Sequence, residues 1–277
     1  MVGSEAALLM LATVSCKHLH PPMYNQEISI LINSDIDKDE LIDEFNLLMA
    51  YYRGGGQTQG RIEPLYICDN KMVCLPFTLE KNSLDPKYNN FYVIRQSKRL
   101  EEICNAKLVF RTVGKSYEDY DGACNCNKPD FYILITNYVS ISSPITCGTC
   151  NNAVPLYRLP KYHDQSYMPI LSWETNYISC DRLQMNCEVG ERWALNQMQE
   201  IKSQLSKQGI KICNKVEELT SIPTYYYLHN YRKFKDLEPL RPCPSCGKKW
   251  KLKKQLHREF DYKCDNCRLI STISKYS

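Results

Sequence analysis

The sequence predicts an α+β protein: a strand-rich, mixed α+β body, followed by a helical segment and a small C-terminal zinc ribbon. Short alternating apolar stretches dominate the first half, longer helical stretches follow, and paired cysteines close the chain. Of the 277 residues, 43% are apolar and 24% are charged, which is an ordinary globular composition. This composition excludes disordered, collagen-like and coiled-coil proteins.

The body is expected to span residues 23–140. Its best helix covers residues 37–52, where the apolar side chains recur on one stripe: Leu41, Phe45, Leu48, Met49 and Tyr52. Asp69 and Asn70 separate two β-rich stretches and predict a hairpin turn. The other expected elements are a second helix and several strands, at residues 97–104 for the helix and 26–33, 63–68, 72–78, 107–113 and 131–138 for the strands.

Residues 141–240 are expected to form a mainly helical segment packed on the body. The best helix there covers residues 190–207, with Gly209 as its C-cap. Further helical stretches are expected at residues 164–187 and 211–219, and a strand at residues 222–228 closes the segment. Two prolines in residues 237–242 indicate a linker to the ribbon, residues 241–277.

Residues 1–22 are interpreted as an N-terminal extension. The apolar stretch 6–16 resembles the core of a signal peptide, but no Lys or Arg precedes it. It is also too short to span a bilayer. The chain has 15 cysteines, an odd number in a long chain rich in Lys and Glu, which favours reduced thiols over a disulfide framework. We therefore expect a cytoplasmic protein that does not enter a membrane.

The strongest motif is a pair of C-x-x-C turns at the C-terminus, Cys243 with Cys246 and Cys264 with Cys267. Seventeen residues separate the pairs, which lies inside the spacing range of structural zinc sites. Four thiolates satisfy the tetrahedral preference of Zn²⁺ and leave no position for a substrate water. The sequence thus predicts one closed, structural zinc site.

A second set of cysteines is less regular. Cys124 and Cys126 form a C-x-C pair, and Cys147 and Cys150 form a C-x-x-C pair after 20 further residues. They could hold a second zinc ion, or lie apart in an exposed loop and a tight turn, or include a redox pair. The other seven are expected to be small core residues: Cys16, Cys68, Cys74, Cys104, Cys180, Cys187 and Cys213.

The net charge of +4 hides a polarised chain. Residues 1–240 carry 25 basic and 28 acidic side chains, whereas residues 241–277 carry ten and three, for a net charge of +7. A basic patch around an aromatic residue is typical of nucleic-acid binding, although such residues could equally solubilise the ribbon or contact a protein. The candidate contact residues are Lys248, Lys249, Trp250, Lys251, Lys253, Lys254, Arg258 and Arg268.

No catalytic motif is evident, and we expect a protein that is not an enzyme. Residues 113–116 end like a phosphate-binding loop, but Val109 stands where that loop needs a glycine. His163 and His229 are better explained as a surface turn and a strand end than as catalytic bases.

Several of these stretches together resemble an uncharacterised bacterial family described as zinc-ribbon-containing, candidate nucleic-acid-binding proteins. The resemblance covers residues 23–277 and rests on residues 143–150, 154–160, 190–193, 223–228, 243–250 and 260–271. Members of this family occur beside Rhs-type polymorphic toxins, which implies an immunity protein that binds and neutralises a cognate toxin domain. The alternative hypothesis is a nucleic-acid-binding zinc-ribbon protein.

Overall fold

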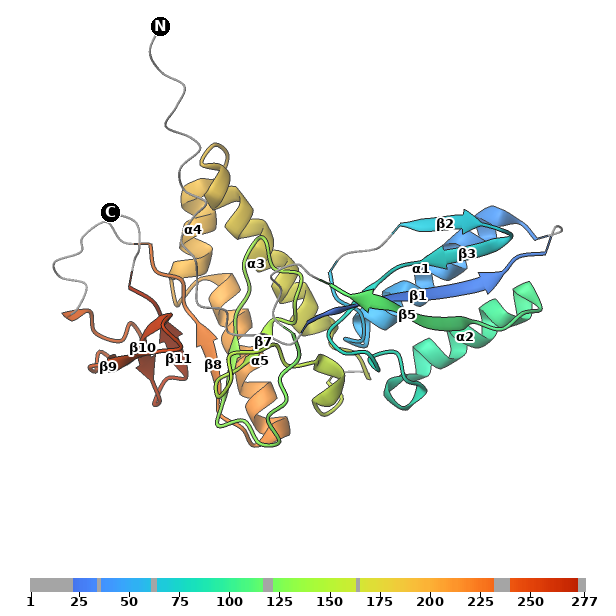
Figure 1. Ribbon diagram of the computed structural model, residues 1–277. Coiled ribbons are helices and arrows are strands. Elements are labelled where there is room, and N and C mark those ends of the chain that lie inside the picture. Colours follow the sequence, from blue (N-terminus) through green and yellow to red (C-terminus); the bar gives the residue numbers. More distant parts are fainter. Residues whose placement is uncertain are drawn as a thin grey trace, which may run out of the picture.

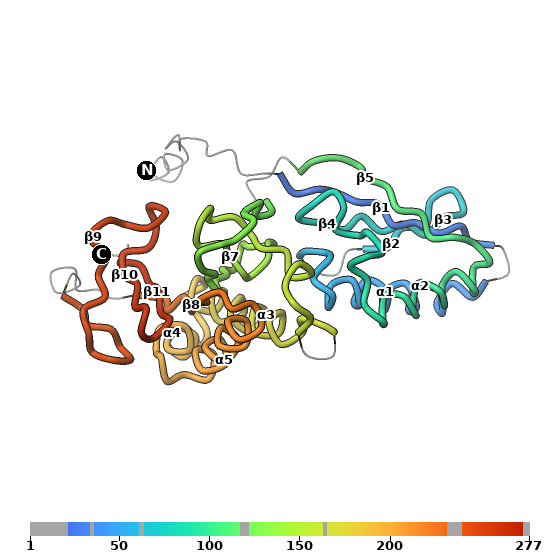
Figure 2. Tube along the Cα trace, turned by 90° about the horizontal axis from the view of Figure 1, so that it is seen from below, coloured from blue at the N-terminus to red at the C-terminus, as the bar shows by residue number. Residues whose placement is uncertain are grey.

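The computed structural model describes residues 22–33, 36–60, 64–116, 122–162, 165–231 and 240–273. The chain forms two α+β units side by side, each a sheet covered by helices (Figure 1). The helices of both units lie on the same side of the molecule, toward the bottom of Figure 2. The predicted α+β class is therefore confirmed. The predicted extension lies outside the described residues, apart from Pro22.

The N-terminal unit contains a five-stranded sheet, here called the N-terminal sheet, in the order β2-β3-β1-β4 with β5 paired to the other side of β1. All of its pairings are antiparallel. Its elements are β1 (Tyr24–Leu31), α1 (Lys38–Gly54), β2 (Leu65–Cys68), β3 (Lys71–Cys74), β4 (Phe77–Thr78), the 3-10 turn Pro86–Tyr88, α2 (Phe91–Cys104) and β5 (Val109–Lys115).

The core of this unit lies between the sheet and the helices α1 and α2. The predicted stripe of α1 is buried along its whole length. Ile28, Ile30 and Met72 meet it from the sheet. The turn between β2 and β3 is the predicted one, because Asp69 and Asn70 both adopt positive φ, at 49° and 56°.

The C-terminal unit is built on a six-stranded sheet, the C-terminal sheet, in the order β7-β6-β8-β11-β10-β9. Its central strand β8 runs parallel to both β6 and β11, and the other pairings are antiparallel. Its elements are β6 (Tyr132–Leu134), β7 (Ile145–Cys147), the 3-10 turn Leu156–Arg158, α3 (Met168–Asn186), α4 (Glu191–Gln199), α5 (Gln204–Thr220), β8 (Thr224–Tyr227), β9 (Lys251–Leu256), β10 (Phe260–Cys264) and β11 (Leu269–Ser271).

The structure corrects the helix predicted over residues 190–207. It breaks into α4 and α5, because the hydroxyl of Ser203 caps a new helix by accepting a hydrogen bond from the Ser206 N–H at 3.0 Å. Gly209 is not a C-cap but lies inside α5. A Cβ atom at this position would come within 2.2 Å of the Tyr226 ring, so glycine allows α5 to approach β8 closely.

The two units are joined by buried contacts. Arg53 at the end of α1 donates to the carboxylate of Glu174 on α3 at 2.8 Å. Burial raises the pKa of Glu174, and the Arg53 guanidinium opposes that rise. The Tyr167 N–H also donates to the Gly54 carbonyl at 2.8 Å. Among the described residues, no helix is long and apolar enough to cross a membrane.

Candidate metal centres

The four cysteines of the predicted ribbon converge. The sulfur atoms of Cys243, Cys246, Cys264 and Cys267 all lie within 4.8 Å of one another, and those of Cys246 and Cys264 are 3.7 Å apart. Zinc bound by four sulfurs at about 2.3 Å requires sulfur atoms about 3.8 Å apart. The arrangement therefore fits a tetrahedral, four-thiolate metal site.

The backbone of each ribbon turn is shaped for such a site. In the first turn, the Gly247 N–H donates to the Cys243 carbonyl at 2.8 Å, and the Cys243 N–H donates to the Lys248 carbonyl at 2.9 Å. Gly247 adopts φ 70°, and Arg268, which follows Cys267 in the second turn, adopts φ 50°. Each turn thus closes on a left-handed residue directly after its second cysteine.

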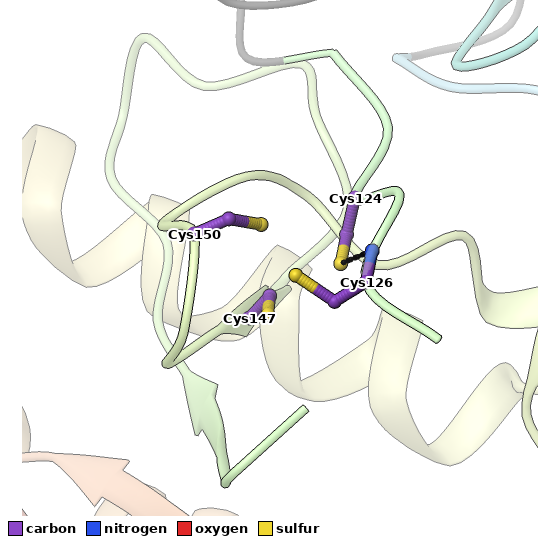
Figure 3. A group of neighbouring side chains, drawn as sticks. All are labelled: Cys124, Cys126, Cys147 and Cys150. Atoms are coloured by element: carbon purple, nitrogen blue, oxygen red, sulfur yellow. Dashed lines mark hydrogen bonds between the residues drawn. The ribbon is translucent and has the colours of Figure 1, made fainter. Parts of the chain in front are cut away.

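The second set of cysteines also converges, although the sequence left this open. The sulfur atoms of Cys124, Cys126, Cys147 and Cys150 lie within 4.8 Å of one another. Figure 3 shows the four side chains gathered in one space, with the Cys126 N–H donating to the Cys124 sulfur at 3.3 Å. We call this group the second tetracysteine site.

The C-x-x-C turn of the second site repeats the geometry of the ribbon turn. The Asn151 N–H donates to the Cys147 carbonyl at 2.8 Å, and the Cys147 N–H donates to the Asn152 carbonyl at 2.9 Å. Asn151, the residue after the second cysteine, adopts φ 61°. These are the same bonds and the same left-handed position as around Gly247, so the turn has the backbone of a metal-binding knuckle.

Hydrogen bonds lower the pKa of one cysteine at each site, whereas the hydrogen bond with Cys147 raises the pKa of Cys124, and burial raises the pKa of Cys126, Cys243 and Cys264. The pKa of Cys147 falls to about 4, first because of the hydrogen bond with Cys124 and further because of the backbone N–H groups of Cys150 and Thr149. In the ribbon, the backbone N–H of Lys248 lowers the pKa of Cys246 to about 7. Since metals bind the thiolate form, Cys147 and Cys246 are the thiols best prepared to bind a cation.

The other described cysteines differ in their exposure to solvent. Cys74, Cys104, Cys180 and Cys213 are buried, as expected of core residues. Cys68 and Cys187 are exposed, and the prediction for them was wrong: Cys68 lies on an edge strand and Cys187 at the end of α3. Cys16 lies outside the described residues.

Two of the eight predicted contact residues already have partners within the protein. Trp250 is only 3% exposed and stacks on Tyr262 with ring centroids 5.0 Å apart, so it belongs to the core and presents no face to a partner. The guanidinium of Arg268 donates to both carboxylate oxygens of Glu217 on α5 at 2.9 Å. The remaining six are exposed: Lys248, Lys249, Lys251, Lys253, Lys254 and Arg258.

A groove of about 880 Å³ separates the ribbon from the second tetracysteine site. Lys254 and Arg258 line it on one side, and Phe131 and Cys150 line it on the other. His257, at the turn between β9 and β10, donates from Nε2 to the Gly148 carbonyl at 2.7 Å. This bond connects the tip of the ribbon to the knuckle of the second site, a contact that the sequence did not predict.

Comparisons with known proteins give a family. A protein of Haemophilus influenzae, described only as uncharacterized, is 34% identical over 239 residues, which cover 83% of this chain and 89% of that protein. The chain belongs to the family of this protein. A second uncharacterized protein of the same organism is 36% identical over 166 residues, covering 60% of this chain and 81% of that protein. No solved structure matches significantly.

Three family models divide the chain, and each is described as a domain of unknown function. They match residues 23–114 (DUF8589), 126–229 (DUF2310) and 232–276 (DUF8594). The expected domain boundaries at residues 140 and 240 fall inside the second and third matches. The ribbon site lies within one match, whereas the second tetracysteine site begins two residues before the middle one. The descriptions name neither a zinc ribbon nor a toxin.

Proposed function

We propose that this protein is a non-enzymatic binding protein with two structural zinc ions, and that it acts in the cytoplasm as an immunity protein that neutralises a cognate Rhs-type toxin domain. The ligand sets support the structural role. Four thiolates complete a tetrahedron around each ion and leave no position for a substrate or an activated water. The zinc ions then hold the backbone of the C-terminal unit.

The observation that carries the protein-binding role is the open face of the N-terminal sheet. The helices α1 and α2 cover one face, where Phe110 meets Tyr52. On the other face, the strand registers align Tyr66, Val73, Ser29 and Val109 in one row across four strands. Tyr66 is 50% exposed and Val109 is 54% exposed.

Further apolar side chains extend this row. Leu31 and Val113 lie on the same face, each about half exposed. The ion pair between Glu27 and Arg111 lies on this face between Val109 and Val113, and Lys71 lies beside Leu31. Exposed apolar side chains interspersed with charges are typical of protein-binding surfaces. A nucleic acid would gain little from this face, so it favours a protein partner.

Co-expression with the toxin domain encoded next to the gene tests the proposal. Wild-type protein should restore growth and form a stoichiometric complex with the toxin domain. Tyr66→Asp and Leu31→Asp should abolish both effects, because they place charges in the apolar face. Ile94→Asp, which alters an equally exposed apolar residue on α2, is the matched control and should still protect. Failure of the wild-type protein to restore growth would refute the immunity role.

Elemental analysis tests the metal sites. We expect two zinc ions per chain, and one after Cys150→Ser or Cys264→Ser. Cys187→Ser removes an exposed cysteine outside both sites and should leave two. Two zinc ions in the Cys150→Ser variant would show that the second tetracysteine site does not hold the metal.

A second candidate function, nucleic-acid binding, is favoured by the groove beside the ribbon. Lys254 and Arg258 line it, and Lys249, Lys251 and Lys253 are exposed nearby in the sequence. The affinity for a single-stranded oligonucleotide should then fall steeply with salt, and Lys254→Ala should reduce the salt slope by about one. A flat salt response would exclude this function. Lysines also protect an exposed edge strand such as β9 from pairing with other chains, so their presence alone does not require nucleic acid.

A further inference from the structure

The strand β5 forms an open edge of the N-terminal sheet. It is seven residues long and, among the described strands, pairs only with β1. Val109, Phe110 and Val113 on it are 54%, 43% and 51% exposed. A long edge strand with exposed apolar side chains on both faces is a template for another strand, unless its backbone groups are turned away or covered.

The backbone groups of β5 do point outward at two positions. In β1, the N–H groups of Gln26 and Ile32 donate away from β5, to the carbonyls of Pro76 and Asn70. Since backbone groups alternate along a strand, Glu27 and Ser29 face β5 and bond their register partners Arg111 and Val109. The N–H and C=O groups of Phe110 and Thr112 therefore face away from the sheet.

A cavity of about 310 Å³ lies beside this edge, between β5, the segment 81–89 and α2. Leu84, Leu108 and Phe110 give it apolar walls, and Lys81, Glu101 and Asp85, which is paired with Lys87, line it as well. Figure 1 shows β5 at the border of the sheet next to α2. A strand added to β5 would direct alternate side chains toward this cavity and the others onto the open face beside Val109 and Val113.

The charges at this edge favour an acidic occupant. Arg111 is paired with Glu27, and Glu101 is paired with Lys107. Lys81 and Lys115 are exposed, and neither makes an ion pair with a described residue. A second copy of the chain would bring two further lysines of this kind to the edge, which would add repulsion.

We propose that β5 and the cavity beside α2 form a peptide-binding groove, which takes an extended, β-branched-rich and acidic segment of another protein by strand addition. The main-chain bonds would run to Phe110 and Thr112, alternate apolar side chains would fill the cavity, and a carboxylate would meet Lys81. Main-chain pairing plus pockets for alternate side chains is a general mode of peptide recognition. The inference does not depend on the identity of the partner proposed above.

The test uses a phage-displayed library of 12-residue peptides, selected on the zinc-loaded, full-length chain. Enriched peptides should combine Val, Ile or Thr at alternate positions with Asp or Glu. The affinities of these peptides for the Thr112→Pro variant are then measured by fluorescence anisotropy. This substitution removes one outward N–H and leaves the hydrogen bonds between β1 and β5 intact. Thr112→Val is the matched control, because it loses the same hydroxyl, which donates to Gln26 at 3.1 Å, but keeps the N–H.

We expect Thr112→Pro to weaken binding at least about tenfold and Thr112→Val to change it less than about threefold. If Thr112→Pro does not fold, as judged by circular dichroism, Lys81→Glu serves instead and should weaken binding of the acidic peptides several-fold. Absence of enriched peptides, or equal affinity in Thr112→Pro and Thr112→Val, would overturn the proposal. A wild-type dimer that Thr112→Pro dissociates would assign the edge to a second copy and would also overturn it.

Discussion

Asn151 offers a direct test of the second tetracysteine site, because it holds the left-handed position that closes the Cys147–Cys150 turn. Its side-chain Oδ1 is buried and has no hydrogen-bond partner among the described residues, so substitution acts mainly through the backbone. A β-branched residue in this conformation costs about 1–2 kcal/mol, and glycine costs nothing. Asn151→Val should therefore lower the zinc affinity of this site by about 5- to 30-fold, whereas Asn151→Gly should not lower it.

Competition with a chromogenic zinc chelator measures this difference. The wild-type protein should release two zinc ions, and in Asn151→Val one of them should be lost at a correspondingly lower chelator concentration. The ribbon ion is the internal control, since Gly247 and Arg268 are unchanged. Equal affinities in the valine and glycine variants would refute the knuckle geometry assigned to residues 147–152.

Three further outcomes are expected. Gly209→Ala should lower the melting temperature in calorimetry, because a Cβ 2.2 Å from the Tyr226 ring costs about 1–3 kcal/mol and exceeds a helix-propensity gain of about 1 kcal/mol. Burial lowers the pKa of His229 to about 4, so as the pH falls the unfolded chain takes up a proton on His229 before the folded protein does. The free energy of unfolding should therefore fall by up to about 3 kcal/mol between pH 6.5 and pH 4. His229→Gln should flatten this slope in denaturant titrations at different pH values. Arg268→Ala and Glu217→Ala should show a coupling of about 1 kcal/mol or less in a double-mutant cycle, since the pair is partly exposed.

Local features of the fold were predictable where one physical signal dominates. The stripe of α1 was identified in full, because a 3.6-residue apolar period reports burial directly. The helix over residues 190–207 was not, because its apolar period continues across a turn that only the capping hydroxyl of Ser203 marks. Gly209 was misread for a related reason: a glycine selected for close approach looks the same in sequence as one selected for a helix end.

Long-range pairing could not be predicted. β8 pairs in parallel with β6, which lies about 90 residues earlier, and with β11, about 45 residues later. Nothing in the composition of these short strands specifies their neighbours, because each is only three or four residues long and mostly buried. The sequence therefore suggested a ribbon linked to a helical segment, whereas the structure shows one continuous sheet.

The candidate metal ligands were easier to predict where their spacing in the sequence is regular. The ribbon cysteines follow a spacing that by itself implies a closed site. The C-x-C pair does not, and its convergence with Cys147 and Cys150 depends on Cys124 lying beside residue 153, where Ala123 and Ala153 form a bridge. One local signal was overlooked: Asn151 follows the second cysteine, as Gly247 does in the ribbon, and asparagine is among the residues that tolerate the left-handed conformation.

The basic ribbon is held firmly against the rest of the C-terminal unit. The strands that carry Cys147 and Cys264 lie on opposite sides of β8 in the same sheet, and the ribbon is further fixed by Arg268 on α5 and by His257 on Gly148. The strand β9 and its lysines are therefore held in a fixed position relative to the second tetracysteine site. Loss of a metal ion from either proposed site should therefore change the shape of the groove between the ribbon and the knuckle.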